Sequence, residues 1–340
     1  MQREKKIKAG RARRPAARSR NADVVFYEAF AEEAEALRSR LPAGLRAILT
    51  DRTIQEQGEA APPAALVSLR TQSVLPLAWA PRLAGVLTRS TGYDHVRLYR
   101  EQAGRPLPCG YLPRYCARAV AEHALLLWLA LLRRLPLQLR QFAGFDRDGL
   151  TGRECLGRTL TVVGVGNIGR EVARVGRGLG MRVLGVDLIR RHPEIAYVSP
   201  GNGLSSAEVI VCAMNLTADN RGYFNRRTWR LVRPGTVFVN IARGELAPTA
   251  DLTWALDRGL LGGAGLDVFE EESEAAGALR GARQRDPAAR ALLKLARRTD
   301  VLLTPHNAFN TTEAVRRKAE QAVEQVTRFL KTGTFRWPVP

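Results

Sequence analysis

The stretch VVGVGNIG at residues 162–169 constrains this chain more than any other part of its sequence. An apolar, β-branched run enters the pattern Gly164-x-Gly166-x-x-Gly169, helix-like residues follow, and a second apolar run ends in Asp187, 18 residues after the last glycine. A strand, a glycine turn, a helix and a second strand ending in an acid are the parts of a dinucleotide-binding βαβ unit. We therefore expect an α/β fold built on a parallel sheet, with a dinucleotide bound at the start of the helix.

The residues of this turn have distinct physical roles. Gly164 permits the tight turn, Gly166 lets a pyrophosphate approach the backbone, and Gly169 lets the helix pack against the strand. Asn167 and Ile168 lie between these glycines, where the free N–H groups of a helix start and its positive dipole end favour phosphate.

Asp187 selects the cofactor. Its carboxylate is placed to accept hydrogen bonds from the adenosine ribose hydroxyls and would repel a 2′-phosphate. The sequence therefore predicts NAD, although Arg190 and Arg191 follow closely and keep NADP as an alternative.

The strongly basic composition raises the question of a nucleic-acid partner. The formal net charge is +20, and residues 1–20 alone carry nine Lys or Arg against one Glu. Such a segment cannot bury a core, so residues 1–21 are predicted to be a basic, disordered tail. The remaining charge is scattered evenly and is mostly Arg. We therefore do not expect a nucleic-acid partner, while the tail leaves that function open.

Several classes of protein and site are disfavoured by composition. No run of 18 apolar residues is present, and the longest candidate, residues 119–132, contains Glu122 and His123, so we expect a buried helix and no membrane partner. The four cysteines show neither CxxC spacing nor metal-like partnering with histidine, so no metal site is expected. Free thiols predict a reducing, cytoplasmic location.

Alternating apolar and helical segments run along the whole chain and predict two sheets. A long helix is expected from Arg118 to Leu135, ended by Pro136, and residues 137–157 are expected to be a loop or an oligomer arm. A helix is also expected from Glu28 to Leu41. Strands are expected at residues 23–27, 46–50, 65–69, 85–88, 159–164, 182–186, 208–213, 236–241, 264–269 and 301–304.

The segment after His306 is too short to form a domain of its own, so it should pack back on the N-terminal part. We therefore expect two Rossmann-like, doubly wound parallel-sheet domains, one inserted into the other. The NAD-binding domain would span residues 118–306, and the substrate domain would span residues 22–117 and 307–340.

Three chemically useful side chains follow late strands of the second predicted sheet. Arg243 follows VFVNIA, Glu272 follows LDVF and His306 follows LLTP, and ligands bind at the carboxyl edge of open α/β sheets. A cation, an acid and a histidine at one edge form a plausible active site. From spacing alone the alternatives stay open, with Arg243 on the surface and Glu270 to Glu272 a solvated acidic run.

At this point the sequence resembles a known family, the NAD-dependent D-isomer-specific 2-hydroxyacid dehydrogenases. The resemblance covers roughly residues 22–340. It rests on STGYDHV (90–96), RAVAEHALLL (118–127), VVGVGNIGREV (162–172), VNIARGE with GLDVFEEE (239–245 and 265–272) and TPHNAF (304–309). TPHNAFNT, Tyr115 and the ending FRWPVP favour the D-lactate dehydrogenase branch.

The resemblance implies roles for individual residues. Arg243 is similar to the arginine that binds the substrate carboxylate and polarises the keto oxygen, His306 to the general acid/base, and Glu272 to its carboxylate partner. The backbone N–H groups of Arg70, Thr71, Gln72 and Ser73 resemble the loop that holds the substrate carboxylate, and Tyr115 the aromatic wall. Further cofactor contacts are expected from Asn215, which stands where proline is common in the family, and from Thr217, Ile241, Ala242 and Asp267.

These observations favour an enzyme that transfers a hydride between NAD(H) and a small 2-keto acid of the pyruvate type, forming a D-2-hydroxy acid. Two alternatives remain. The first is an NAD-sensing transcriptional regulator on the same fold. The second is a dehydrogenase for glycerate, phosphoglycerate, glyoxylate or phosphite-like compounds. A homodimer is the expected assembly.

Overall fold

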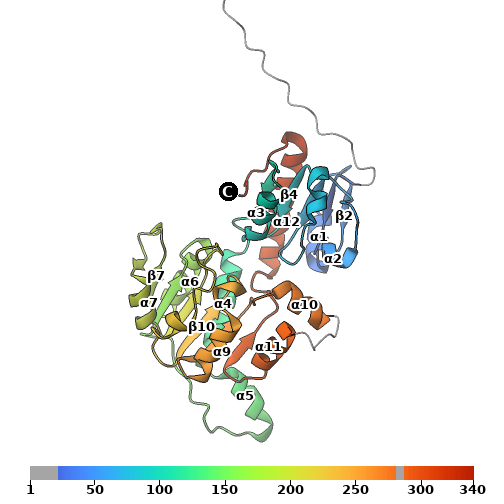
Figure 1. Cartoon of the computed structure of the whole chain (residues 1–340). Helices are drawn as coiled ribbons and strands as arrows, with labels where there is room; N and C mark the ends of the chain where they lie inside the picture. The colour runs from blue at the N-terminus through green and yellow to red at the C-terminus, as the bar shows by residue number, and fades with distance from the viewer. Residues whose placement is uncertain (1–21, 281–286) are drawn as a thin grey trace, which may run out of the picture.

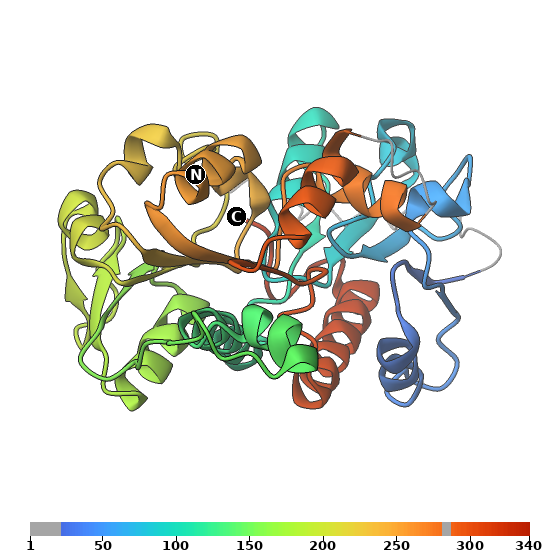
Figure 2. The same cartoon turned by 90° about the horizontal axis from the view of Figure 1, so that it is seen from below.

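The computed structural model describes residues 22–280 and 287–340, which form two lobes with a parallel sheet in each (Figures 1 and 2). The basic tail predicted for residues 1–21 lies outside the described residues. The prediction of two doubly wound α/β domains is confirmed, because every pairing between neighbouring strands of either sheet is parallel.

The first sheet belongs to the upper lobe of Figure 1 and has the strand order β2-β1-β3-β4-β5. Its strands β1, β3, β4 and β5 are buried throughout, as apolar strands covered on both faces are. The strands are β1 (Val24–Phe26), β2 (Ala47–Leu49), β3 (Leu66–Leu69), β4 (Gly85–Thr88) and β5 (Cys109–Gly110). Its helices are α1 (Ala31–Arg38), α2 (Ile54–Gln57), η1 (Leu77–Arg82), α3 (Asp94–Gln102) and α12 (Thr312–Thr332).

The second sheet has seven strands in the order β12-β11-β10-β9-β6-β7-β8. Six of them were predicted, and the seventh is a two-residue edge strand, too short to leave a pattern in the sequence. The strands are β6 (Thr159–Val163), β7 (Arg182–Val186), β8 (Ala196–Tyr197), β9 (Val209–Cys212), β10 (Thr236–Asn240), β11 (Leu261–Leu266) and β12 (Val301–Leu303).

The helices of the second lobe lie on both faces of its sheet, as Figure 2 shows. They are α4 (Ala117–Leu132), α5 (Leu135–Gln141), η2 (Phe142–Gly144), α6 (Asn167–Gly178), α7 (Pro200–Ser206), α8 (Arg226–Trp229), η3 (Gly244–Leu246), α9 (Thr249–Asp257), α10 (Glu272–Arg280) and α11 (Pro287–Ala296). The apolar helix α4 packs on α6, β10 and β11.

The C-terminal segment returns to the first lobe. Helix α12 packs on α1 and β4, and Pro338 forms an isolated bridge with Gly110 of β5. We therefore propose the boundaries 22–117 with 307–340 for one domain and 118–306 for the other.

Two predicted helix boundaries were wrong for identifiable reasons. The chain leaves α4 at Leu132 because Arg134 adopts a left-handed φ of 54°, and Pro136 then lies in the first turn of α5, where its missing N–H costs nothing. Residues 137–157 therefore contain most of α5 and the turn η2. The helix predicted from residue 28 starts only at Ala31, because Glu28 has a left-handed φ of 55°.

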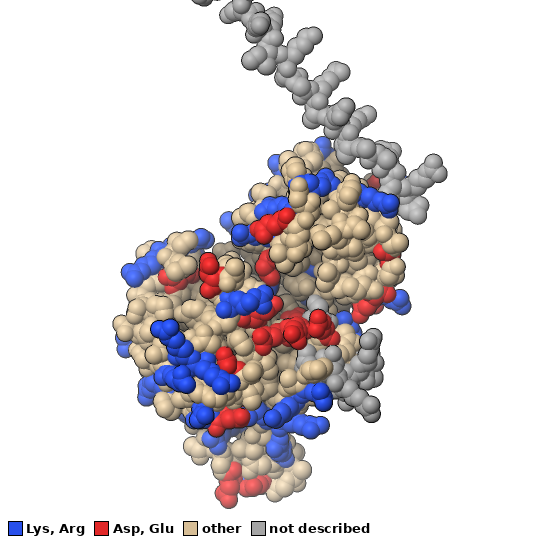
Figure 3. Space-filling model, in the orientation of Figure 1, with Lys and Arg blue, Asp and Glu red and all other residues tan. Residues whose placement is uncertain are grey.

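Charged side chains cover both lobes on the face drawn in Figure 3, where Lys and Arg are interspersed with acids. No helix among the described residues is both long and apolar enough to cross a membrane.

Candidate active site

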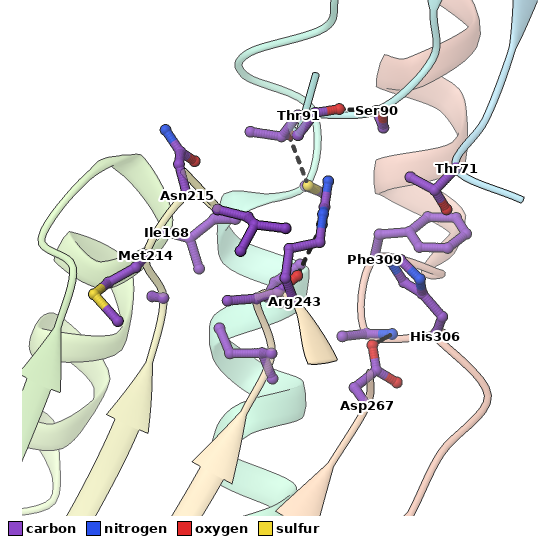
Figure 4. Close-up of a pocket in the computed structure, with 18 of the residues that line it drawn as sticks. Thr71, Ser90, Thr91, Ile168, Met214, Asn215, Arg243, Asp267, His306 and Phe309 are labelled. Carbon is purple, nitrogen blue, oxygen red and sulfur yellow. Dashed lines mark hydrogen bonds between the residues drawn. The ribbon is translucent and has the colours of Figure 1, made fainter. Parts of the chain in front are cut away.

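The carboxyl edges of the two sheets face each other across a cleft that contains two pockets. The smaller, about 80 Å³, collects residues from the ends of β9, β10, β11 and β12 and, from the first lobe, residues that follow β3, β4 and β5 (Figure 4). Predicted site residues that line it are Thr71, Tyr115, Ile168, Asn215, Ile241, Ala242, Arg243, Asp267 and His306. The larger pocket, about 640 Å³, shares His306 and Phe309 with it and is lined by Arg70 and Gln72.

Arg243 enters the small pocket from the end of β10 and reaches the first lobe. Its Nη2 donates to Asp94 Oδ1 at 2.9 Å, its Nε donates to the same oxygen at 3.1 Å, and its Nη1 donates to the Ala242 carbonyl at 2.8 Å. Burial alone would lower the pKa of Arg243, but the Asp94 carboxylate raises it above its ordinary value. The guanidinium is therefore a fixed positive charge held across the cleft.

Asp94 is the counterpart of this cation in the first lobe. Burial alone would raise its pKa, and the charge and hydrogen bonds of Arg243 instead hold it below the ordinary value. Gly92 lies against the same guanidinium, since a Cβ at this position would be 1.6 Å from Arg243 Nη2. Because Gly92 has no side chain, the guanidinium of Arg243 can occupy this position.

His306 and Glu272 form a hydrogen-bonded pair. The distance from His306 Nδ1 to Glu272 Oε1 is 2.7 Å, and about a fifth of each side chain is exposed. A carboxylate can only accept here, so Nδ1 donates and Nε2 remains for a ligand. Burial would raise the pKa of Glu272, but His306, Arg243 and a hydrogen bond from Gln72 lower it below its ordinary value.

The backbone around this pair explains which of the three consecutive glutamates meets the histidine. Glu270 Oε2 accepts the N–H of Thr249 at 2.6 Å, and the exposed Glu271 has a left-handed φ of 51° that redirects the chain into α10. Glu272 then starts α10 facing the cleft. His306 is itself left-handed, with φ 51°, and such strain is common where a side chain is held for function.

Asp267 supports the turn that carries His306. Its buried carboxylate accepts hydrogen bonds from the N–H groups of Asn307 (2.8 Å) and Ala308 (2.9 Å) and from the Thr304 hydroxyl. Asp267 lines the small pocket as predicted, but these contacts use both of its oxygens.

The glycine-rich turn has the geometry that the sequence required. Gly164 has φ 92°, and a Cβ there would lie 2.5 Å from the Met214 nitrogen, while one on Gly169 would lie 2.0 Å from the Gly164 oxygen. At Gly166 a Cβ would meet no protein atom within 4 Å, and no side chain caps α6. The open space therefore lies where a pyrophosphate would approach the helix start.

Asp187 stands beside this turn at the end of β7. Its Oδ2 accepts the N–H of Val165 at 2.6 Å, and its Oδ1 accepts the N–H of Ile189 at 2.9 Å. The carboxylate is only partly buried and so retains accepting capacity for ribose hydroxyls. The residues present therefore fit NAD.

Six predicted cofactor residues lie outside both pockets: Gly164, Gly166, Gly169 and Asp187, described above, and Asn167 and Thr217. The Asn167 side chain donates to the Pro113 carbonyl at 3.2 Å, which links the two lobes. Thr217 is exposed, and its N–H donates to Asn220 Oδ1 at 2.8 Å.

The role expected for the loop from Arg70 to Ser73 needs correction. The N–H groups of Arg70, Gln72 and Ser73 donate to the carboxylate of Glu28 at 2.9 to 3.1 Å. Glu28 is 7% exposed and occupies the loop as an internal anion. These three amides are therefore not available for the substrate carboxylate.

Sequence reasoning missed three residues of the first lobe that line the small pocket with Arg243, and two of them, Gly92 and Asp94, contact its guanidinium. Thr91, Gly92 and Asp94 line the small pocket and follow β4. The strand itself was predicted, so applying the carboxyl-edge rule to the first sheet, as was done for the second, would have found them.

Known proteins resemble this chain in sequence. The model of the NAD-binding domain of the D-isomer specific 2-hydroxyacid dehydrogenases matches residues 125–308. A D-lactate dehydrogenase of Streptococcus agalactiae is 30% identical over 270 residues, covering 77% of this chain and 81% of the relative. A glyoxylate reductase of Thermococcus gammatolerans is 35% identical over 209 residues, covering 57% and 62%.

The fold agrees with a solved structure over nearly the full length. The structure of a D-lactate dehydrogenase from Aquifex aeolicus, complexed with NAD and lactic acid, is 27% identical and superposes with a TM-score of 0.78. The match covers 91% of this chain and 96% of that chain. It therefore extends over both lobes.

Proposed function

Because this chain belongs to the D-isomer specific 2-hydroxyacid dehydrogenase family, as its motifs predicted, we propose that its site interconverts a small, pyruvate-like 2-keto acid and the D-2-hydroxy acid. The chain is an NAD-dependent oxidoreductase that acts on a 2-hydroxy acid. Bound NADH supplies the hydride for reduction. The turn at Gly166 and the start of α6 would hold its pyrophosphate, and Asp187 its ribose.

Arg243 is proposed to bind the substrate carboxylate and to stabilise charge on the keto oxygen. Its donors toward Asp94 and Ala242 leave one N–H on each terminal nitrogen. A guanidinium that is held rigid before the substrate arrives needs no reorganisation as negative charge develops, which is the basis of electrostatic catalysis.

His306 is proposed as the proton donor in reduction and the acceptor in oxidation. With Nδ1 bound to Glu272, the ring can only exchange its proton with a ligand through Nε2. The hydrogen bond to Glu272 fixes the orientation of the ring, and reduction requires its protonated form.

One observation supports this proposal above all: Arg243 from β10 and His306 after β12 line the same small pocket (Figure 4). A panel of 2-keto acids followed at the nicotinamide absorbance tests it, with D- and L-lactate compared in the reverse direction. We expect NADH-dependent reduction of pyruvate-like substrates and oxidation of the D-isomer only. Absence of turnover with every 2-keto acid would overturn the proposal. The relatives described above are dehydrogenases and reductases, so the regulatory hypothesis has no support among them.

A homodimer is proposed because large apolar side chains are exposed in the segment that runs from α4 to Phe145, just after η2. Leu126 is 57% exposed, Leu139 70%, Phe142 75% and Phe145 70%. Large apolar side chains gathered on one segment mark a protein interface more often than a solvated surface. Light scattering on the native chain and on a Leu139→Ser/Phe142→Ser variant tests this, since only the variant should be monomeric.

The cytoplasm is proposed as the compartment. All four cysteines, Cys109, Cys116, Cys155 and Cys212, are buried free thiols. Free thiols are typical of reducing compartments. Localisation of a tagged full-length chain tests this.

A further inference from the structure

The larger pocket lies at the carboxyl edge of the first sheet, where the strand order changes direction. Strand β1 has β2 on one side and β3 on the other, and the pocket is lined by Phe30 after β1, Arg52 after β2 and Arg70 after β3. Ligands of open α/β sheets bind at this kind of position. His306 and Phe309 complete the pocket and also line the small one, so the two spaces meet beside the proton donor.

Arg70 presents a preorganised guanidinium to this pocket. Its Cζ lies 4.3 Å from the ring centre of Phe309 and 5.5 Å from that of Phe30, so two aromatic rings hold the planar group. Within residues 22–280 and 287–340, its guanidinium nitrogens form no hydrogen bond or ion pair. The Arg70 guanidinium is half-buried between two rings, and its N–H donors form a planar fork that can bind a planar anion.

Three acids line the larger pocket with Arg70; two of them are engaged by other groups, and the third, Asp51, is exposed. Glu28 accepts three backbone N–H groups, and Glu56 pairs with Arg280 at 3.1 Å and accepts the N–H of Thr53. Both carboxylates line the pocket, yet neither pairs with Arg70.

The buried carboxylate of Glu33, which interacts electrostatically with Arg70, is bound directly by two other cations. Glu33 binds Arg89 Nε and Lys318 Nζ, each at 2.7 Å. Although burial would raise its pKa, the charges of Arg89, Lys318 and Arg70 lower it to about 2, so Glu33 stays ionised. One carboxylate thus faces three cations, and Arg70 is the one of the three that also lines the pocket.

We propose that Arg70 binds an anionic group at the far end of the substrate side chain, so that the preferred substrate is a 2-keto acid with a second acidic group. This inference rests on the proposed function. With the keto group at Arg243 and His306, a side chain that passes Phe309 leads into the larger pocket and toward Arg70. The hydride goes to the keto carbon and the proton to its oxygen, and the second acidic group is bound but chemically unchanged.

The test compares substrates of equal shape. Oxaloacetate and 4-methyl-2-oxopentanoate differ in that a carboxylate replaces an isopropyl group, and 2-oxoglutarate and 5-methyl-2-oxohexanoate form the longer pair. The ratio of kcat/KM within a pair does not depend on the fraction of folded enzyme, so it stays informative if a variant is unstable. We expect the ratio in the native enzyme to favour one of the acidic substrates, and 3-phosphohydroxypyruvate shows whether phosphate can replace carboxylate.

Arg70→Met keeps an apolar stem but removes the charge, and we expect it to lower that ratio roughly 100-fold, with pyruvate affected less than about threefold. Arg258→Met is the matched control, because Arg258 also stacks on an aromatic ring, 4.9 Å from the centre of Trp254, but lines neither pocket. Equal kcat/KM within both pairs in the native enzyme, or an unchanged ratio in Arg70→Met, would overturn the inference. Failure to reduce any 2-keto acid would overturn the proposed function instead.

Discussion

In the first sheet the chain leaves its first strand, β1, through Glu28, with φ 55°, whereas in the second sheet it leaves β6 through Gly164, with φ 92°. Both residues follow the strand from which the sheet grows in two directions. Glu28 places its carboxylate on three amides of the neighbouring loop. Gly164 has no side chain, and the start of α6 beyond it has no side-chain cap.

This difference shows how one topology can serve two purposes. Both lobes have the sheet edge at which parallel α/β folds bind ligands. In the first lobe an internal carboxylate accepts three amide N–H groups of the loop after β3. In the second lobe Asp187 accepts the N–H of Val165, and the first N–H groups of α6 are proposed to bind phosphate. The side chain at the switch point, more than the fold, therefore decides which lobe holds the dinucleotide.

The largest effect is expected for Gly92→Ala, a substitution in the first lobe that should displace Arg243 of the second lobe. In Gly92→Ala the new Cβ would meet Arg243 Nη2, the end of a flexible side chain, so Arg243 should move while the fold is retained. We expect kcat to fall by roughly 10³-fold, as for loss of an electrostatic stabiliser, with the Kd for NADH unchanged. Gly144→Ala, which meets no atom within 4 Å, is the control. Near-normal turnover in Gly92→Ala would remove Arg243 from the mechanism.

A second variant, Gly166→Ala, tests whether NADH binds at the start of α6. Gly166→Ala has room in the protein and an ordinary φ of −83°, so its Tm should equal that of the native chain. Its methyl group would occupy the space of the pyrophosphate, and the Kd for NADH, measured by fluorescence, should rise on the order of 100-fold. Gly178→Ala, in the same helix and also without neighbours, should bind NADH normally. Tight NADH binding by Gly166→Ala would place the phosphates elsewhere.

Because Glu28 already binds the loop amides of the first sheet, we expect its removal to lower the stability of the fold and to leave NADH binding unchanged. Glu28→Ala leaves three N–H groups without their acceptor in a half-buried loop. We expect a loss of about 2 kcal/mol in the free energy of unfolding, measured with urea, and an unchanged Kd for NADH. Glu35→Ala, on the exposed face of α1, is the control. If Glu28→Ala weakened NADH binding and left stability unchanged, the contrast between the two edges would fail.

The smallest effect is expected for Glu272, whose carboxylate is proposed to serve chemistry, in contrast to that of Glu28, which binds backbone N–H groups. Reduction needs protonated His306, and the ring is hydrogen-bonded to Glu272, a carboxylate whose pKa His306 and Arg243 lower against the opposing effect of burial. Glu272→Gln removes this negative charge from beside the ring and should move the high-pH limb of the reduction profile to lower pH. Oxidation, which needs the neutral ring, should lose less rate at neutral pH.

Glu270→Gln is the matched variant for this profile, because Glu270 binds the Thr249 N–H rather than the histidine. Its profile should superimpose on that of the native enzyme. A shift in Glu270→Gln with none in Glu272→Gln would mean that the proton chemistry depends on the other acid.

Much of the second lobe could be predicted because its signals are local. The turn at Gly164, the acid at Asp187 and the strands on either side lie within one βαβ unit, and their periodicity is visible in the sequence. The ends of β10 and β12 were also recognisable, so Arg243 and His306 could be proposed together from the parallel-sheet rule. Pro136 misled the prediction, because proline is tolerated in the first turn of a helix as well as after its end.

The sequence by itself determined the two parallel sheets, the dinucleotide turn and the types of residue available for chemistry. Only the tertiary structure decided that Asp94 orients Arg243, that Glu28 fills the loop after β3, and that Arg70 is left facing a pocket. Glycine turns and strand periods are set by backbone sterics within a few residues. The hydrogen-bonded partners Arg243 and Asp94 are 149 residues apart in the chain, and Glu28 and the Arg70 N–H are 42 apart, so these contacts are chosen by how the two lobes and their strands pack.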